Sequence, residues 1–292
     1  MNKSILITGS TSGIGRAATT EFAAHGYRVF ATYRSDVHRA ELASIDNVHP
    51  IHMDVTDAGD LERAYATIAA EIGEDGLYAV LNNAGITHSA PFEFLEERRM
   101  REVMEVNVMA PYRLTQTFIP LLVAHNKGNH VKARVVNVAS WAGLMAAPFI
   151  APYNASKFAV VGLTESMFYD LRLLDIHTVL AIPGLTKTPL LAKTTGAGAA
   201  SLNAMPAEGR ARYQNLFDHY ASMSASSADL PMLATPEKVA HKLRRIVDKP
   251  KPRFKNHLGV DASLVDHVMT RLPWAARVAM NNRMYKLSST RA

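Results

Sequence analysis

Cysteine is absent from this chain of 292 residues. Its absence excludes disulfide bridges, thiolate metal ligands and a cysteine nucleophile, and it is compatible with a reducing compartment. No stretch of the sequence is apolar for long enough to cross a bilayer, and the apolar run at residues 5–7 is too short for a signal peptide. We therefore expect a cytoplasmic protein without a transmembrane segment.

Acidic residues are fewer than basic ones. The 26 Asp and Glu face 32 Lys and Arg, which gives a formal net charge of +6 and a sequence pI of about 9.5. Much of the excess comes late in the chain, from Lys242, Arg244, Arg245, Lys249, Lys251, Arg253 and Lys255. We interpret it as a solvated surface and expect no nucleic-acid partner, because no nucleic-acid motif or interleaved aromatic residues accompany it.

The remaining composition, 48% hydrophobic and 20% charged, supports a large buried core. Short apolar runs alternate with segments of helical periodicity. Strands are expected at residues 4–8, 28–32, 49–54, 78–82, 134–138 and 178–182, and helices at 13–25, 57–72, 97–125 and 152–174. Such alternation indicates a parallel sheet covered on both faces. We predict an α/β fold: a single Rossmann-like doubly wound parallel sheet with a helical lid and a C-terminal helical extension.

The regular alternation of expected strands and helices ends after Pro189. Residues 190–232 are rich in Gly, Ala and Ser and contain a helical patch. We expect a mobile excursion that serves as a substrate lid, and a dimer contact through the helical patch is an equal alternative. Thr235-Pro236 resembles a helix start, and residues 251–259 are expected to add an edge strand. We assign residues 1–260 to one catalytic and cofactor-binding domain. Residues 261–292 form a helical extension of the same domain, broken at Pro273.

The extension carries apolar side chains beside arginines. These residues are Leu264, Val265, Val268, Met269, Leu272, Trp274, Val278 and Met280, with Arg271, Arg277 and Arg283. Packing on the body of the protein or on a second subunit is favoured over contact with a membrane surface. We expect a homodimer or homotetramer, and peripheral membrane contact stays open.

The first expected strand runs into the glycine-rich turn Thr8-Gly9-Ser10-Thr11-Ser12-Gly13-Ile14-Gly15, and a helix follows. Glycines let the backbone turn tightly and approach a pyrophosphate, and the helix N-terminus offers unpaired N–H groups to that anion. The spacing is G-x-x-x-G-x-G rather than the common G-x-G-x-x-G. Its place in the first strand–turn–helix unit nevertheless predicts a dinucleotide site.

The end of the second strand, Ala31-Thr32-Tyr33-Arg34-Ser35, selects the cofactor. An acid there binds the ribose 2′-hydroxyl of NAD, whereas an arginine accommodates the 2′-phosphate of NADP. Arg34 is a planar cation suited to that phosphate, and Ser10, Thr11 and Ser35 add hydroxyl groups. We predict NADP(H), with NAD(H) less favoured. Asp36 is counter-evidence if the strand ends later than expected.

Tyr153 and Lys157 lie four residues apart at the start of an expected helix and therefore share a face. A neighbouring ammonium lowers the pKa of a phenol, which makes Tyr153 a usable acid or base near neutral pH. Ser140 ends the fifth strand, where a parallel sheet presents residues to its ligand crevice. We find no metal-ligand spacing among the 12 histidines and expect no metal.

This combination resembles the short-chain dehydrogenase/reductase family over about residues 3–190. The turn at residues 8–15 is similar to the family's T-G-x-x-x-G-I-G loop, Asp54-Val55 to its adenine-contacting pair, and Asn82-Asn83-Ala84-Gly85 to its N-N-A-G signature. Asn107, Ser140, Tyr153 and Lys157 match its catalytic tetrad. Pro183-Gly184, with Thr186 and Thr188, resembles the segment that lines the nicotinamide. With its long C-terminal extension, the chain is more similar to the family's hydroxysteroid and retinol dehydrogenase branch than to its short classical members.

The resemblance implies a role for each residue. Tyr153 exchanges a proton with the substrate oxygen, Lys157 lowers the pKa of that phenol and binds the nicotinamide ribose, and Ser140 orients the carbonyl. Asn107 helps to hold a water that relays protons to Lys157. The expected cofactor contacts are Gly9, Ser10, Thr11, Ser12, Gly13, Ile14, Gly15, Arg34, Ser35, Asp54, Val55, Asn83, Ala84, Gly85, Tyr153, Lys157, Pro183, Gly184, Thr186 and Thr188.

The expected substrate contacts flank the catalytic groups. They are Ser140, Trp141, Leu144, Met145, Phe149, Tyr153, Leu185 and Leu190. Most are large and apolar, which favours a hydrophobic ketone, aldehyde or alcohol. Three alternatives remain: a non-catalytic NADP(H)-binding regulatory or scaffold protein on the same fold, a nucleic-acid or anionic-membrane binder acting through the basic C-terminal third, and, less favoured, a sugar-nucleotide epimerase or dehydratase.

Overall fold

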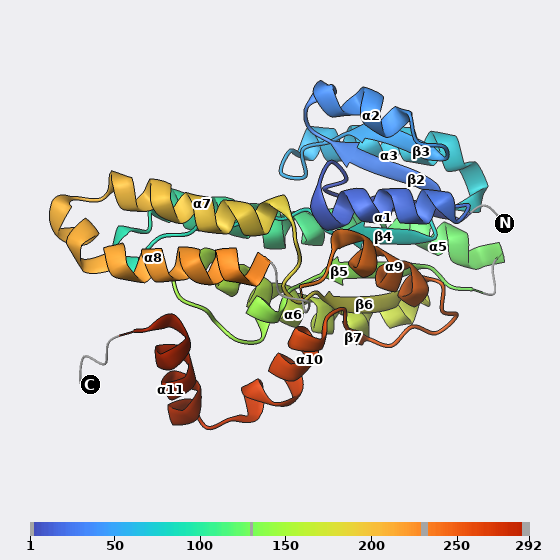
Figure 1. The fold of residues 1–292 in the computed structure, drawn as a ribbon. Coiled ribbons are helices and arrows are strands. Elements are labelled where there is room, and N and C mark those ends of the chain that lie inside the picture. Colours follow the sequence, from blue (N-terminus) through green and yellow to red (C-terminus); the bar gives the residue numbers. More distant parts are fainter. Residues whose placement is uncertain (1–2, 129–130, 229–232, 288–292) are drawn as a thin grey trace.

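A seven-stranded parallel sheet forms the centre of the molecule (Figure 1). The computed structural model describes residues 3–128, 131–228 and 233–287. The strands follow the order β3-β2-β1-β4-β5-β6-β7. They are β1 Ser4–Ile7, β2 Arg28–Tyr33, β3 Val48–His52, β4 Ala79–Asn82, β5 Arg134–Val138, β6 His177–Ile182 and β7 Lys255–His257. The predicted doubly wound fold is confirmed, and the six strands expected with most support lie within two residues of their predicted bounds.

Helices cover both faces of the sheet, which explains why β1, β4 and β5 are buried along their whole length. On one face, apolar side chains of α1 (Gly13–Ala24), α2 (Arg39–Ala43) and α9 (Pro236–Val247) join the core. On the other face, α3 (Ala58–Ile72), α5 (Ala110–Gly128) and α6 (Ala151–Leu171) do so. Short 3₁₀ turns lie at Asp36–His38, Gly73–Asp75, Phe92–Phe94, Trp141–Gly143, Arg172–Leu174 and Met269–Arg271.

One long helix was expected at residues 97–125, and the structure divides it into three parts. The α-helix α4 (Glu97–Met104) passes into a π-helical turn (Glu105–Met109) before α5 begins. A π turn inserts one extra residue per turn and often marks a functional site. Here it contains Asn107, whose side chain is buried.

The segment after Pro189 is helical over most of its described length. It forms two helices, α7 (Pro189–Ala204) and α8 (Ala207–Ala228), which lie side by side and extend away from the sheet (Figure 1). Leu202, Met205 and Phe217 pack together in the half of this pair that lies toward the turn between the two helices, away from the sheet. The predicted excursion is therefore present as a helical hairpin, while its role as a lid stays a proposal.

The C-terminal part follows the expected order. The Thr235 hydroxyl accepts a hydrogen bond from the Lys238 amide at the start of α9, and β7 pairs with β6 as the predicted edge strand. Two helices then follow, α10 (Val260–His267) and α11 (Trp274–Tyr285), and Pro273 separates them. Among the described residues, no helix combines the length and apolar character needed to cross a membrane.

Candidate active site

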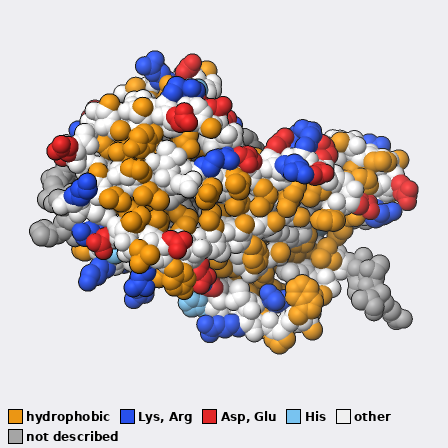
Figure 2. All heavy atoms as spheres, turned by 180° about the vertical axis from the view of Figure 1, so that it is seen from behind, with side chains coloured by type: hydrophobic (Ala, Val, Ile, Leu, Met, Phe, Trp, Pro, Cys, Tyr) orange, Lys and Arg blue, Asp and Glu red, His pale blue; other side chains and the backbone are white. Residues whose placement is uncertain are grey.

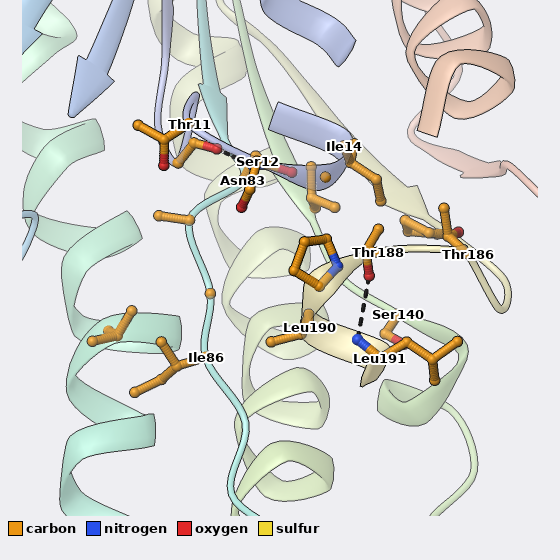
Figure 3. Close-up of a pocket in the computed structure, with 18 of the residues that line it drawn as sticks. Thr11, Ser12, Ile14, Asn83, Ile86, Ser140, Thr186, Thr188, Leu190 and Leu191 are labelled. Atoms are coloured by element: carbon orange, nitrogen blue, oxygen red, sulfur yellow. Dashed lines mark hydrogen bonds between the residues drawn. The ribbon is translucent and has the colours of Figure 1, made fainter. Parts of the chain in front are cut away.

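A cavity of about 580 Å³ opens at the carboxyl ends of the central strands. β1 lies between β2 and β4 there, so the strand order reverses at this point, which is where ligands of doubly wound sheets bind. Figure 3 shows side chains from the turn after β1, the segment after β4, Ser140 and the start of α7 around one open space. The cavity joins the glycine turn to Tyr153 and Lys157.

The glycine turn has a backbone that other residues cannot adopt or fit. Gly9 and Gly13 have φ angles of +70° and +54°. A Cβ added to Gly15 would lie 2.1 Å from the Gly9 carbonyl oxygen. The turn is tied to the end of β4 because the Thr8 hydroxyl accepts hydrogen bonds from the amides of Asn83 and Ala84, both at 3.0 Å. These contacts hold the turn open toward the cavity.

The mouth of this turn suits the pyrophosphate of a dinucleotide. The first turn of α1 contains no acidic residue, and the side chain of its N-cap residue, Ser12, makes no capping hydrogen bond. The first amides of α1 therefore present unpaired donors and a partial positive charge beside the cavity. A Cβ at Gly9 would lie 3.0 Å from the Ala84 Cα and one at Gly13 would lie 3.2 Å from the Thr188 side chain, so both positions need glycine. The residues present therefore fit a nicotinamide dinucleotide.

The other end of the predicted cofactor site carries Arg34. β2 ends at Tyr33, so Arg34 and Ser35 follow the strand directly and line the cavity, whereas Asp36 begins a separate turn and is not part of the lining. The Arg34 side chain is 71% exposed, and its guanidinium lies 3.7 Å from a carboxylate oxygen of Asp54. A cation at the strand end, without an acid, suits a ribose that carries a 2′-phosphate.

Tyr153, Ser140 and Lys157 meet at the deep end of the cavity. Ser140 lies beyond β5 and caps the turn that follows it, since its hydroxyl accepts the Ala142 amide at 3.2 Å. Pro152 lies in the first turn of α6, and Tyr153 and Lys157 lie one helical turn apart on the same helix. The Lys157 ammonium lies 5.6 Å from the centre of the Tyr153 ring and donates a hydrogen bond to the Val138 carbonyl at 2.8 Å.

The electrostatics of this group correct one expectation. The sequence predicted that Lys157 lowers the pKa of Tyr153, but burial raises the pKa of Tyr153, and a hydrogen bond with Ser140 opposes that rise. Burial also lowers the pKa of Lys157 from its ordinary value of 10.5 to about 8. Burial is the largest cause of both pKa shifts, and the raised pKa keeps Tyr153 a neutral phenol at neutral pH.

The buried Lys157 ammonium should cost the ligand-free protein stability. The unfolded lysine keeps its proton up to a pH near 10.5, whereas the folded one loses it near 8, so wild-type stability rises with pH between these values. We expect Lys157→Met to raise the thermal midpoint at pH 7 by roughly 2 to 6 °C. The gain should shrink toward pH 10. Calorimetry at both values tests this, and a lower midpoint for the variant at pH 7 would contradict it.

Asn107 reaches the site through other residues. Its side-chain oxygen accepts the Ile86 amide at 2.9 Å, and its nitrogen donates to the Ile86 carbonyl and the Ser156 hydroxyl, both at 2.9 Å. The Ser156 hydroxyl in turn donates to the Tyr153 carbonyl at 2.8 Å. Asn107 thus joins the cofactor-lining segment to the first turn of α6. The relay water that the resemblance implies for Asn107 stays a prediction.

Comparison with known proteins gives the family. A family model described as short chain dehydrogenase matches residues 3–197, about two thirds of the chain. The chain belongs to the short-chain dehydrogenase family. The resemblance inferred from the motifs is confirmed, and the protein is an oxidoreductase of that family.

Several relatives of this short-chain dehydrogenase are reductases by name. An NADPH-dependent 3-dehydrocapnine reductase from Ornithobacterium rhinotracheale is 32% identical over 195 residues, 66% of this chain and 69% of that protein. A 3-amino-tetrahydro-pyrrolizinone reductase from Xenorhabdus hominickii is 29% identical over 222 residues, 76% of this chain and 75% of that protein. A 3-ketoacyl-(acyl-carrier-protein) reductase structure from Brucella melitensis, complexed with NADH, is 25% identical, with a TM-score of 0.71 over 89% of this chain and 97% of that one.

Most residues predicted from the sequence of the short-chain dehydrogenase line its cavity, and six do not. Those outside the lining are Ser10, Gly15, Asn107, Leu144, Met145 and Phe149. Ser10 is fully buried and its hydroxyl donates to the Ile7 carbonyl. Phe149 turns toward α8, where its ring stacks on Phe217 at 4.8 Å. Of the predicted substrate contacts, Leu144, Met145 and Phe149 therefore do not line the cavity.

Other lining residues were missed. They include Tyr33, His38, Ile86, Ile150 and Leu191. Ile86 directly follows the N-N-A-G motif, and Leu191 directly follows a predicted contact, so proximity in sequence was a usable signal for both. Figure 3 shows Leu190 and Leu191 at the start of α7, where the Leu191 amide donates to the Thr188 hydroxyl at 3.3 Å.

Asp261 in α10 reaches this site from beyond the family match. Its carboxylate accepts a hydrogen bond from the Leu185 amide at 2.6 Å. Its other oxygen lies 1.8 Å from where a Cβ of Gly184 would stand and 2.2 Å from where a Cβ of Gly259 would stand. Both glycines are thus required to admit the carboxylate. Asp261 is a positioning residue for the segment 183–186 that lines the cavity, and no local sequence pattern pointed to it.

Tyr285, near the end of α11, also contributes to the deep end of the site. It is 8% exposed and packs with Ala147 and Ile150, and Trp141 and Tyr153 contact the same cluster. A hydrogen bond of 3.0 Å between the His219 ring and the Met284 carbonyl joins α8 to α11. α11, the last described helix, therefore completes the wall of the short-chain dehydrogenase cavity beside Tyr153.

Proposed function

We propose that this short-chain dehydrogenase interconverts a hydrophobic ketone or aldehyde and its alcohol with NADP(H), using Tyr153 as general acid and base. The supporting observation is that Tyr153, Ser140 and Lys157 line the same cavity as the glycine turn and Arg34. NADP(H) bound along that cavity supplies or accepts the hydride. The residues at its deep end handle the proton and the charge on the substrate oxygen.

In the reducing direction, Tyr153 donates its phenolic proton to the carbonyl oxygen as the carbonyl carbon gains the hydride. Its raised pKa keeps that proton in place at neutral pH until the substrate arrives. The Ser140 hydroxyl, already a hydrogen-bond partner of Tyr153, donates to the same oxygen. The Lys157 ammonium stabilises the phenolate that remains. In the oxidising direction the same phenolate takes the proton of the alcohol.

The lining of the deep end favours an apolar substrate. Trp141, Ile150, Leu185, Leu190 and Leu191 provide its side walls. Apart from Lys157, the charged Lys, Arg, Asp and Glu side chains of the described lining are Arg34 and Asp54. They form an ion pair at the cofactor end of the cavity. A charged substrate would therefore lose water without gaining a partner apart from Lys157.

The experiment that tests the proposal is a screen of NADPH oxidation with purified protein across steroids, retinoids, fatty aldehydes and acyl ketones, each paired with the reverse reaction. We expect turnover with at least one apolar carbonyl and none with charged sugars. Tight NADPH binding without turnover of any compound would instead favour the non-catalytic, NADP(H)-binding alternative on the same fold.

Arg34→Ala should separate the two nicotinamide cofactors. We expect the KM for NADPH to rise about tenfold, because one exposed, charge-assisted contact to the 2′-phosphate is lost. The KM for NADH should change less than threefold. Steady-state kinetics with both cofactors measure the difference. Arg39→Ala, an exposed arginine outside the cavity lining, is the matched control. Equal increases for NADPH and NADH would remove the argument for a phosphate contact.

We also propose that a second copy of the chain covers the face formed by α6 and the turn before α5. Phe158 and Tyr169 on α6, with Met109 and Tyr112 beside it, are between 41% and 58% exposed. Figure 2 shows hydrophobic side chains gathered across the middle of the rear face. An apolar surface of this kind is typical of a subunit contact. Light scattering on the purified protein tests a dimer or tetramer, and cell fractionation tests the cytoplasmic location expected from the sequence.

A further inference from the structure

The C-terminal segment, residues 249–292, holds a positive charge that the rest of the chain lacks. It contains nine of the 32 Lys and Arg but only two of the 26 Asp and Glu, so its formal charge is +7 against −1 for residues 1–248. A charge excess confined to one segment creates a local field that attracts an anionic surface. The following observations concern its described part, residues 249–287.

Both acids of the segment are engaged within the protein. Asp261 accepts the Leu185 amide beside the catalytic cavity. Asp266 is 14% exposed, lies 2.7 Å from the His257 ring nitrogen and 3.1 Å from the Lys255 ammonium. Neither carboxylate is free to offset the cations outside. In the described part of the segment, the outward surface therefore carries no unpaired negative charge.

α10 also exposes a row of aliphatic side chains. Val260, Leu264 and Val268 follow one another at intervals of four residues and are 77%, 46% and 47% exposed. Residues four apart lie on one face of a helix. The opposite face packs inward, since Ala262 and Val265 are buried. The exposed row is thus a separate apolar stripe and not the edge of the core.

An exposed tryptophan continues this stripe. Trp274, the first residue of α11, is 72% exposed, and the Arg277 guanidinium lies 5.3 Å from the centre of its ring. Arg271 lies between the two helices and is exposed. We call this set the basic–apolar face: Val260, Leu264, Val268, Arg271, Trp274 and Arg277. In Figure 2, blue and orange side chains follow the lower edge of the molecule, to which α10 and α11 belong.

We infer that the basic–apolar face binds the surface of an anionic lipid bilayer. Aliphatic side chains and a tryptophan enter the boundary between headgroups and acyl chains, and the surrounding arginines pair with anionic headgroups. A nucleic acid or an acidic protein would use the cations but would leave the aliphatic row against water. The inference goes beyond the proposed reaction and does not depend on it.

The location of this face gives it a functional meaning. α10 also carries Asp261, which positions the cavity segment 183–186, and α11 also carries Tyr285, which packs beside Tyr153. A protein bound through this face holds its catalytic cavity next to the bilayer. Apolar molecules dissolved in that bilayer then reach the site over a short path.

Vesicle flotation with the full-length protein tests the inference. We expect binding to phosphatidylcholine vesicles containing 30% phosphatidylglycerol to be at least tenfold tighter than to pure phosphatidylcholine, and to weaken between 50 and 500 mM NaCl. The double variant Leu264→Glu/Trp274→Glu should bind at least tenfold more weakly. Arg271→Glu should lose about fivefold or more, because each basic residue near an anionic surface contributes about 1 kcal/mol.

Matched controls lie elsewhere on the surface. Leu173→Glu changes an aliphatic side chain that is 84% exposed beyond α6, and Arg210→Glu reverses an exposed charge on α8. Both should bind within twofold of wild type. Equal binding of all variants, or equal binding to neutral vesicles, would overturn the inference. Salt-sensitive binding to a DNA duplex that survives in the double variant, with no vesicle binding, would overturn it as well.

Tryptophan fluorescence provides an independent readout, and it needs only tryptophan-to-phenylalanine substitutions, which conserve the fold. The chain contains only Trp141 and Trp274. We expect anionic vesicles to shift the fluorescence of wild-type protein to the blue. The shift should persist in Trp141→Phe and disappear in Trp274→Phe. The opposite pattern would show that the lipid acts at the catalytic cavity and would overturn the inference.

Discussion

Tyr153→Phe lowers kcat by between about 10²-fold and 10⁴-fold, which is the range that a positioned general acid or base contributes. The substitution removes only the phenolic oxygen, while the ring keeps its packing beside Tyr285 and Ile150. NADPH affinity should therefore stay within about threefold of wild type. Stopped-flow measurement of NADPH oxidation, together with a fluorescence titration of NADPH binding, separates the two quantities.

Tyr65→Phe is the matched control for this substitution. Tyr65 is partly exposed on α3 and lies outside the cavity lining, so the loss of its hydroxyl group should leave kcat unchanged. If Tyr153→Phe retained more than about a tenth of the wild-type kcat, proton transfer by this phenol would not limit the reaction. The proposed mechanism would then be wrong even if the protein reduces carbonyl compounds.

Asp261→Ala should reduce kcat/KM by about 10-fold to 100-fold. The substitution removes the carboxylate that holds the Leu185 amide, and a hydrogen bond to a charged group contributes about 1.5 to 3 kcal/mol. The segment that follows β6 then loses its anchor and the cavity wall beside it loses its position. Most of this change should appear as a higher KM for NADPH, measured at a saturating concentration of the carbonyl substrate.

The conservative variant distinguishes positioning from general destabilisation. Asp261→Asn keeps an acceptor oxygen within reach of the Leu185 amide and should recover most of the lost affinity. Gly184→Ala should by itself be severe, because its Cβ would stand 1.8 Å from an Asp261 oxygen, and it should be milder in the Asp261→Ala background. Strict additivity of the two substitutions, or failure of Asn to rescue, would show that Asp261 does not act through this contact.

The sequence predicted those parts of the site that lie within single strand–turn–helix units. The glycine turn and the pair Tyr153 and Lys157 are local patterns, since a turn or one helical turn brings their residues together without reference to the rest of the fold. The doubly wound arrangement follows from the alternation of strands and helices and from right-handed crossovers. These elements were therefore predicted close to where the structure has them.

The rest depends on contacts between distant segments. Asp261 and Leu185 are separated by 76 positions, and Tyr285 meets Ile150 only because α11, which contacts α8, brings the end of the described chain to the start of α6. No periodicity or motif specifies such contacts. The direction of Phe149 was missed for the same reason, because its packing partners lie on α8. The direction of the Tyr153 pKa shift was misjudged because burial, its largest cause, is a property of the folded structure.

Because Glu105–Met109 forms a π turn, the number of residues in this stretch affects the geometry of the active site. Removing one residue there would restore ordinary α-helical winding and rotate α4 relative to α5 by about 100°. Val103 and Leu114, which face inward on either side of the turn, could then not both face the core. Insertions and deletions among homologues should therefore avoid this stretch and accumulate in the loops that join the outer helices.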